Sequence, residues 1–583
     1  MEGLDAARQR LSLGYRAGLL ALASAALSAP HTSFAQSTAP PPRGPAPGTS
    51  AGELDPGSRV TRPPPRPNQG AFTPEPPGPC PLETSDVRVT LNSVSFRGST
   101  VVSEGELQAA YAEYLGSPQK VAVICAIRDR AARIIFESGV LARVEIPEQR
   151  IAGGALVLEV IEAHVVNVRV RGDVGPVQDL VERYAEKLRG MKPFDMARAQ
   201  RYLLLASDVP GVRVRAAVRP STSPERGAVD IDLAVSRKPP EAFGKVDNTG
   251  SQSVGRWSGL ARVQFEGFTS IGETTTVTAL STLERNEQWL VQVAETARFG
   301  SEGLVGRASL TYGESHPGAA LKPIDLASSS LVGGLEAAYP LLRTRDRNLY
   351  IATGIDVIDT RTTSQGGQPF SRDKLRVLYA RADGDFRTEA VGRPVLLSGA
   401  LGVRQGVSAL GASDRGDARL TRADGDPSAW VVRAQGGADM AISDRLVGMF
   451  RGQAQYAKAS LFPYEQIAVG GLTVGRGYDP AALLGDKGVT GGFELRYGPW
   501  QLHPQIAAAP YGFFEMGYIA NNNIGRTGAQ KDRALKSVGA GVIFRMFNRA
   551  NLEVTYARPL DSVRPGAARP ADRVLIQLTA SLL

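Results

Sequence analysis

Arg476 is the residue of this 583-residue sequence best placed to bind an anionic partner. It lies at the centre of a VGRGY core, Val474 to Tyr478, within the glycine-rich residues 470–492. The flanking glycines let the backbone turn sharply and approach another surface closely. Apolar and charged side chains then alternate over residues 493–497, which predicts a strand. The stretch predicts a loop that holds one cation and one aromatic ring at a defined position. The alternative is an ordinary surface hairpin loop, which has a similar composition.

A carboxylate that could receive this arginine follows further along the chain. Strict alternation over residues 511–518 predicts a strand with two different faces. One face carries Phe514, Met516 and Tyr518, and the other carries Phe513, Glu515 and Gly517. A carboxylate beside a glycine on the inner face is a natural partner for Arg476.

These two stretches together closely resemble the TpsB family, the outer-membrane transporters of two-partner secretion that export haemolysins and filamentous adhesins. That family has an inward-folded loop with a V/I-R-G-Y core and a later strand that reads roughly F-x-D-x-G. Here Gly475 is inserted before Arg476, and Glu515 replaces the aspartate. The resemblance implies an inward loop at 471–491 held inside a barrel lumen. Its holding residues would be Arg476, Gly477, Tyr478, Glu515 and Gly517.

Composition is consistent with a chain exported from the cytoplasm. Residues 1–35 are predicted to be a signal peptide, with a basic start, an Ala/Leu core and a small-residue cleavage site. No later apolar run reaches ~18 residues, so no transmembrane helix is predicted. The formal charge of +9 does not indicate nucleic-acid binding, because the arginines are spread along the chain and no nucleic-acid motif is present.

The proline-rich residues 36–85 cannot bury a core and are predicted to form an extended linker. The TpsB family often has a plug helix in this region. Here only residues 53–62 could form one, and Pro56 limits that segment to a turn or two.

Two short α/β units of ~75 residues each should follow, because the same order of patterns occurs twice. The first, residues 86–164, is predicted to contain strands at 87–96, 141–151 and 155–165 and helices from Ser103 and over 121–138. The second, residues 165–238, repeats that order with strands at 165–171, 212–219 and 228–235 and helices at 177–188 and 195–206. Both units resemble the POTRA domains of the same family.

Residues 241–583 consist of repeated short alternating strands, which predicts a membrane β-barrel of about sixteen antiparallel strands at ~21 residues per strand and connection. The last strand is typical, with apolar side chains on one face and Gln577, Thr579 and Ser581 on the other. Turn-like clusters, such as residues 381–385 and 521–523, are expected to separate the strands. The predicted fold class is therefore α+β POTRA repeats followed by the barrel.

Other candidate chemistry is weak, and no catalytic residue, cofactor or metal site is predicted. The four histidines have no ligand-like spacing, and neither a G-x-S-x-G elbow nor a P-loop is present. Two acidic tripeptides, at 383–385 and 424–426, could suggest calcium, but turn chemistry explains them better.

Cys80 and Cys125 are the only cysteines. They could remain two free thiols. A disulfide is favoured, because both lie in one small exported domain and the resemblance places a cysteine at both positions.

The resemblance implies a non-enzymatic outer-membrane translocase with its POTRA domains in the periplasm. They would capture an unfolded, adhesin- or haemolysin-like exoprotein by adding a strand to a sheet edge. The edge expected to bind is the strand Val212, Arg213, Val214, Arg215 and Ala216. Outer-membrane lipid and, during biogenesis, the barrel-assembly machinery would be further partners. The alternatives are a barrel-assembly or insertase relative and an outer-membrane enzyme.

Overall fold

The computed structural model describes residue 51 and residues 79–283, 287–522 and 531–582. The predicted signal peptide and most of the predicted linker lie outside these residues. Among the described residues, no helix combines the length and apolarity needed to cross a membrane.

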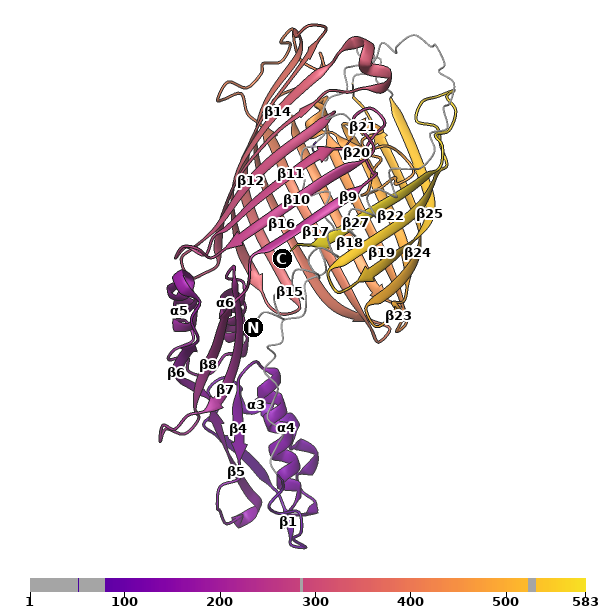
Figure 1. Ribbon diagram of the computed structural model, residues 1–583. Helices are drawn as coiled ribbons and strands as arrows, with labels where there is room; N and C mark the ends of the chain where they lie inside the picture. The colour runs from indigo at the N-terminus through magenta and orange to yellow at the C-terminus, as the bar shows by residue number, and fades with distance from the viewer. Residues whose placement is uncertain (1–50, 52–78, 284–286, 523–530, 583) are drawn as a thin grey trace, which may run out of the picture. The chain divides into compact units, whose positions relative to one another are not determined.

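The first α/β unit packs one long helix on a small sheet (Figure 1). Its elements are β1 (Arg88–Thr90), β2 (Ser93–Arg97), α3 (Glu104–Leu107), β3 (Pro118–Lys120), α4 (Val123–Glu137), β4 (Ala142–Glu145) and β5 (Ala155–Glu162). The strand order is β2-β5-β4, and β1 pairs separately with β3. Helix α3 begins at a capping box, in which Glu106 N donates to Ser103 Oγ and Ser103 N donates to the Glu106 carboxylate.

Two predicted strands of this unit are wrong in extent. Residues 87–96 form two strands rather than one, because Leu91 turns into the core and Asn92 bonds instead to Gly154 O. Residues 141–151 form only the short β4. Beyond β4, the Gln149 side chain makes hydrogen bonds of 2.6 and 2.8 Å to the carbonyl and amide of Val157. In a longer strand, backbone groups would have made these two bonds.

The second unit repeats the plan with β6 (His164–Arg171), α5 (Gln178–Glu186), α6 (Met196–Ser207), β7 (Val212–Pro220) and β8 (Ala228–Arg237). Its sheet order is β6-β8-β7, so β7 lies at an edge. Helix α6 is capped by Asp195, whose carboxylate accepts the amide of Arg198 at 3.0 Å. The core between the helices and the sheet includes Tyr184, Phe194 and Leu233. Short 3-10 turns occur at Gln108–Ala110, Ala112–Tyr114, Ala152–Gly154, Gly175–Val177, Ala319–Ile324 and Pro463–Glu465.

A closed antiparallel barrel forms the rest of the chain (Figure 1). Its strands are β9 (Glu241–Asp247), β10 (Ser258–Glu266), β11 (Thr274–Thr282), β12 (Gln288–Phe299), β13 (Leu304–Ser315), β14 (Ala327–Arg343), β15 (Arg347–Ser364), β16 (Gln368–Ala390), β17 (Arg393–Gly406), β18 (Trp430–Ala441), β19 (Leu446–Ala457), β22 (Lys487–Tyr497), β23 (Trp500–His503), β24 (Ile506–Ala520), β25 (Asp532–Met546), β26 (Ala550–Pro559) and β27 (Arg573–Ser581). Both β22 and β23 pair with β24 and count as one interrupted strand, which confirms the predicted sixteen. The ring closes where β27 pairs with β9.

Alternating side chains give the barrel an apolar outer wall. On β12, for example, Val291 and Val293 are exposed on the outside, whereas Leu290 is buried inside against Leu260 and Leu280. Aromatic pairs lie near the strand ends, Trp430 with Tyr456 at one rim and Tyr497 with Trp500 at the other. Apolar walls between aromatic rims are typical of membrane barrels.

The turn predicted at residues 381–385 is wrong, because these residues lie in the middle of β16. The Asp-Gly composition is typical of turns, but here the aspartates lie on the lumenal face of a long strand and Gly384 lies on its other face. Asp383 pairs with Arg381 at 2.9 Å, and Gly384 lies where an added Cβ would be 2.3 Å from Asn348 O.

Candidate functional site

The residues predicted to form the inward loop fold into a hairpin inside the barrel. Strands β20 (Ile467–Val469) and β21 (Leu483–Gly485) pair with each other, and residues 470–482 connect them. We call residues 467–486 the inward loop. The predicted end at residue 491 is wrong, because Lys487 already begins β22, which pairs with β19 and β24.

The inserted glycine of the VGRGY core has a conformational role. Gly475 has φ of +97°, in the region that side chains other than glycine rarely adopt. A Cβ there would also be 3.0 Å from Gly470 N. The insertion therefore tightens the turn that presents Arg476.

Arg476 and Glu515 form an ion pair that we call the latch. Arg476 Nε lies 2.6 Å from Glu515 Oε1. Glu515 Oε2 accepts the backbone amides of Gly475 and Arg476, both at 2.8 Å, and the hydroxyl of Ser537 at 3.0 Å. The Glu515 side chain is 2% exposed. One carboxylate of the barrel wall thus binds both the side chain and the backbone of the loop.

Three further contacts of the latch were not predicted from the sequence. Glu494 Oε2 lies 3.1 Å from Arg476 Nη1, and the guanidinium carbon is 3.6 Å from the centroid of the Phe513 ring. Ser537 comes from β25. Glu494 and Phe513 left a usable signal, because Glu494 alternates with apolar Phe493 and Leu495 and Phe513 shares the predicted face of Glu515, whereas nothing in the sequence indicated Ser537.

The other predicted residues of the site hold the loop by packing and backbone contacts. The Tyr478 hydroxyl donates to Lys536 O at 2.8 Å and accepts the Asp561 amide at 2.9 Å. Gly477 lies so close to β26 that an added Cβ would be 2.7 Å from Pro559 N. Gly517 packs directly against Val469 of β20, so that an added Cβ would be 2.6 Å from Val469 Cγ2.

An apolar cluster completes the attachment of the loop. It contains Ile467, Val469, Tyr478 and Leu483 from the loop and Ile519 and Leu535 from the wall. All the contacts between loop and wall described here are non-covalent. Strands β20 and β21 form a sheet of their own, so the loop is not part of the strand pairings that close the barrel wall.

Charged side chains also line the lumen outside the latch. Arg404 contacts both Glu465 and Asp356 at 2.8 Å, and Arg433 reaches Glu465 at 3.0 Å. A second group joins Glu336 to Arg307 and Arg381. Within the described ranges, no three histidine, cysteine or acidic side chains come together as metal ligands. The arrangement is a charged lumen that contains a loop held by non-covalent contacts.

The predicted partner-binding strand, β7, carries three arginines on the exposed face of its sheet, Arg213, Arg215 and Arg219. Arg213 lies opposite Ser236 and Arg215 opposite Ala234 on β8. By contrast, Arg169 and Arg171 on β6 pair with Asp230 and Asp232 at 3.1 and 3.2 Å. The positive charge of this face is therefore balanced near β6 and at Arg219, which lies 3.9 Å from Asp232, whereas Arg213 and Arg215 have no carboxylate opposite them.

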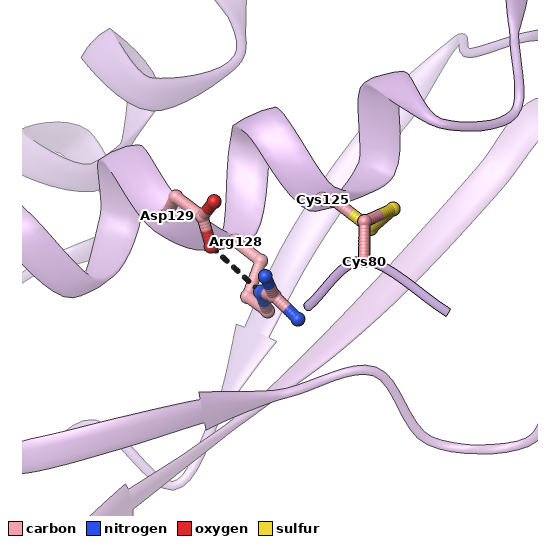
Figure 2. The surroundings of a disulfide bond; sticks show 4 residues. All are labelled: Cys80, Cys125, Arg128 and Asp129. Carbon is pink, nitrogen blue, oxygen red and sulfur yellow. Dashed lines mark hydrogen bonds and ion pairs between the residues drawn. A yellow bond between two sulfur atoms is a disulfide. The ribbon is translucent and has the colours of Figure 1, made fainter. Parts of the chain in front are cut away.

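Cys80 and Cys125 form a disulfide with a Cα–Cα distance of 5.7 Å. Figure 2 shows that it joins the segment before β1 to the beginning of α4. One turn further along α4, Arg128 Nε lies 2.7 Å from Asp129 Oδ1. The disulfide fixes the point where the preceding chain enters the first unit.

Comparisons with known proteins agree with this architecture. The heme/hemopexin transporter protein HuxB of Haemophilus influenzae is 20% identical over 479 residues, which cover 80% of this chain and 82% of that protein. The solved structure of CdiB from Escherichia coli is similar with a TM-score of 0.68 at 16% identity, over 88% of this chain and 94% of that one. CdiB from Acinetobacter baumannii gives 0.60 at 14% identity, over 85% and 90%.

The family matches are more specific than these likenesses. Residues 89–163 match the ShlB-type POTRA domain, which is periplasmic in homologues. Residues 227–544, more than half of the chain, match the model of the haemolysin secretion/activation proteins ShlB, FhaC and HecB. The chain belongs to this haemolysin secretion/activation family of outer-membrane β-barrel transporters.

Proposed function

We propose that this chain is an outer-membrane translocase that captures an unfolded exoprotein with its POTRA domains and secretes it through the barrel. The observation that carries the proposal is the inward loop, which occupies a charged lumen and is held by a non-covalent latch. An obstruction attached in this way suits a passage that must open for a polypeptide and close afterwards. The proposal assigns no catalytic step to the chain.

Capture would begin at the β7 edge of the second unit. An edge strand offers backbone groups that can pair with an incoming extended segment. Arg213 and Arg215 have no carboxylate opposite them on β8, so they favour an acidic segment. Charge along the edge also discourages pairing between two copies of β7.

Binding of the exoprotein to the purified full-length chain tests this step. The double variant Arg213→Glu with Arg215→Glu should weaken binding, and added salt should weaken binding of the wild type. The control is Arg183→Glu with Arg198→Glu, which changes the net charge equally on helices α5 and α6. Equal loss in both double variants would show a non-specific charge effect, and full binding by the β7 variant would place capture elsewhere.

Secretion in cells tests the whole proposal against the insertase alternative. Cells that lack this chain should lose the exoprotein from the medium while their other outer-membrane barrels assemble normally. Plasmid-borne wild-type chain should restore export. Defective assembly of unrelated barrels would favour the insertase alternative instead.

A further inference from the structure

A second buried ion pair ties the root of the inward loop to a different part of the barrel. Asp486, the last residue of the inward loop, is 0% exposed, and Arg422 is 7% exposed. The two groups meet in a bidentate pair, with Nη1–Oδ1 and Nη2–Oδ2 distances of 2.6 and 3.0 Å. The function proposed above does not use this pair.

Asp486 is the centre of a hub that joins four segments. Besides Arg422, its carboxylate accepts the amides of Leu461 and Asn522 at 2.9 and 2.7 Å and the side-chain amide of Gln466 at 3.1 Å. Arg422 in turn donates to the carbonyls of Leu461 and Asn522. The segments are the β17–β18 loop, the residues after β19, the end of the inward loop and the residues after β24.

All four segments lie at the same end of the barrel. Strand β9 follows the second POTRA unit directly, and the barrel strands then run alternately up and down. The connections after β17, β19 and β24 therefore lie at the end away from that entry point. Because POTRA domains of this family are periplasmic, this end opens outside the cell.

The β17–β18 loop, residues 407–429, is also packed against the inside of the wall. Leu420 of this loop and Phe462 form an apolar cluster with Ile358, Leu375 and Val377. Gly425 lies so close to Phe462 that an added Cβ would be 2.6 Å from its ring. The loop is thus folded over the lumen and fixed there by Arg422.

We propose that Arg422 and Asp486 are positioning residues that keep the extracellular mouth closed between transport events. The Arg476–Glu515 latch attaches the tip of the inward loop to β24, whereas this pair attaches its root to the β17–β18 loop. For an exoprotein to leave, the β17–β18 loop must release Asp486 and swing outward. That transport step rests on the function proposed above, but closure of the mouth does not and can be measured alone.

Ion conductance of the purified full-length protein in a planar lipid bilayer tests the closure. Arg422→Ala and Asp486→Asn should each raise the time-averaged conductance about tenfold or more, because removing one partner of a buried hydrogen-bonded pair shifts an equilibrium at least that far. The matched control is Arg415→Ala in the same loop, since Arg415 is exposed and pairs with Asp426 at the surface. This control should conduct as the wild type does.

A shift in electrophoretic mobility on heating shows which variants contain an assembled barrel. Should Arg422→Ala not assemble, the nearly isosteric Asp486→Asn decides the question. Assembled variants with wild-type conductance would overturn the proposal, as would an equal increase in the Arg415 control. If the conductance results show closure through this pair but the wild-type chain exports no exoprotein, the proposed function is refuted and the closure of the mouth is not.

Discussion

Removal of the Glu515 carboxylate should release the inward loop from the barrel wall. In Glu515→Ala the loop loses the bond from Arg476 Nε and the bonds from two backbone amides, all between 2.6 and 2.8 Å. Ser537 loses its partner as well. The wall itself should survive, because the β22–β24 and β24–β25 backbone pairings do not involve this side chain.

The size of the effect follows from the contacts that remain. Breaking a buried ion pair by removing one partner costs about 3–5 kcal/mol. Arg476 still contacts Glu494 at 3.1 Å and the Phe513 ring, so the lower end, about 3 kcal/mol, applies. At about 1.4 kcal/mol per tenfold change, the equilibrium between docked and released loop should shift roughly 100-fold.

A cysteine placed in the loop can report this equilibrium. Val474 is 4% exposed in the docked loop, and the two natural cysteines are already bonded to each other. In a Val474→Cys background, a maleimide should therefore label the protein only when the loop is released. Labelling should be roughly 100-fold faster in Glu515→Ala than in the parent.

Glu336→Gln is the matched control for this labelling experiment. Glu336 is a buried lumenal carboxylate with two arginine partners, Arg307 and Arg381, and none of its hydrogen bonds or ion pairs reaches the inward loop. Its variant should label at the parental rate. Equal labelling of the Glu515→Ala variant and the parent would refute the role of the latch.

Two further predictions concern the disulfide and the glycine below the loop. Replacing Cys80 and Cys125 with serine should destabilise the first POTRA unit by about 4 kcal/mol, the loop-closure value for a separation of 45 residues. Urea unfolding of the full-length protein measures this loss of stability, and an unchanged unfolding midpoint would contradict the prediction. Gly517→Ala should undock the loop because the new methyl group would collide with Val469, and Val469→Ala should restore docking. Gly512→Ala on the same strand, where an added Cβ is no closer than 3.8 Å to any neighbour, should have no effect on labelling, and failure of Val469→Ala to rescue would count against the collision.

The order of elements could be predicted from the sequence because each depends on a local pattern. Alternation in residues 511–518 placed Phe514 outside and Glu515 inside, and the structure has the same faces. Ser103 and Asp195 cap helices by contacts within three residues, so the helix starts were readable. Wrong assignments arose where a local pattern had two meanings, as with the Asp-Gly residues of β16.

Contacts that depend on register or on loop paths could not be predicted. Ser537 reaches Glu515 only because the two residues are paired across β24 and β25. Arg422 and Asp486 are far apart in the chain, and both lie in segments without a repeating pattern. Their meeting depends on how the β17–β18 loop folds over the lumen, which no local signal encodes.

Secretion through the barrel lumen requires the exoprotein to contact the lumenal face, and adjacent residues of β13 distinguish that face from the outer wall. Ser309 lies on the lumenal face with Arg307, whereas Leu310 is exposed on the outer wall. A photocrosslinking amino acid at either position, in cells that are exporting the exoprotein, reports which face the moving chain contacts. An exoprotein that passes through the lumen should crosslink from position 309 and not from position 310. Normal secretion without a crosslink at 309, or with equal crosslinking at both positions, would rule out passage along the lumenal face.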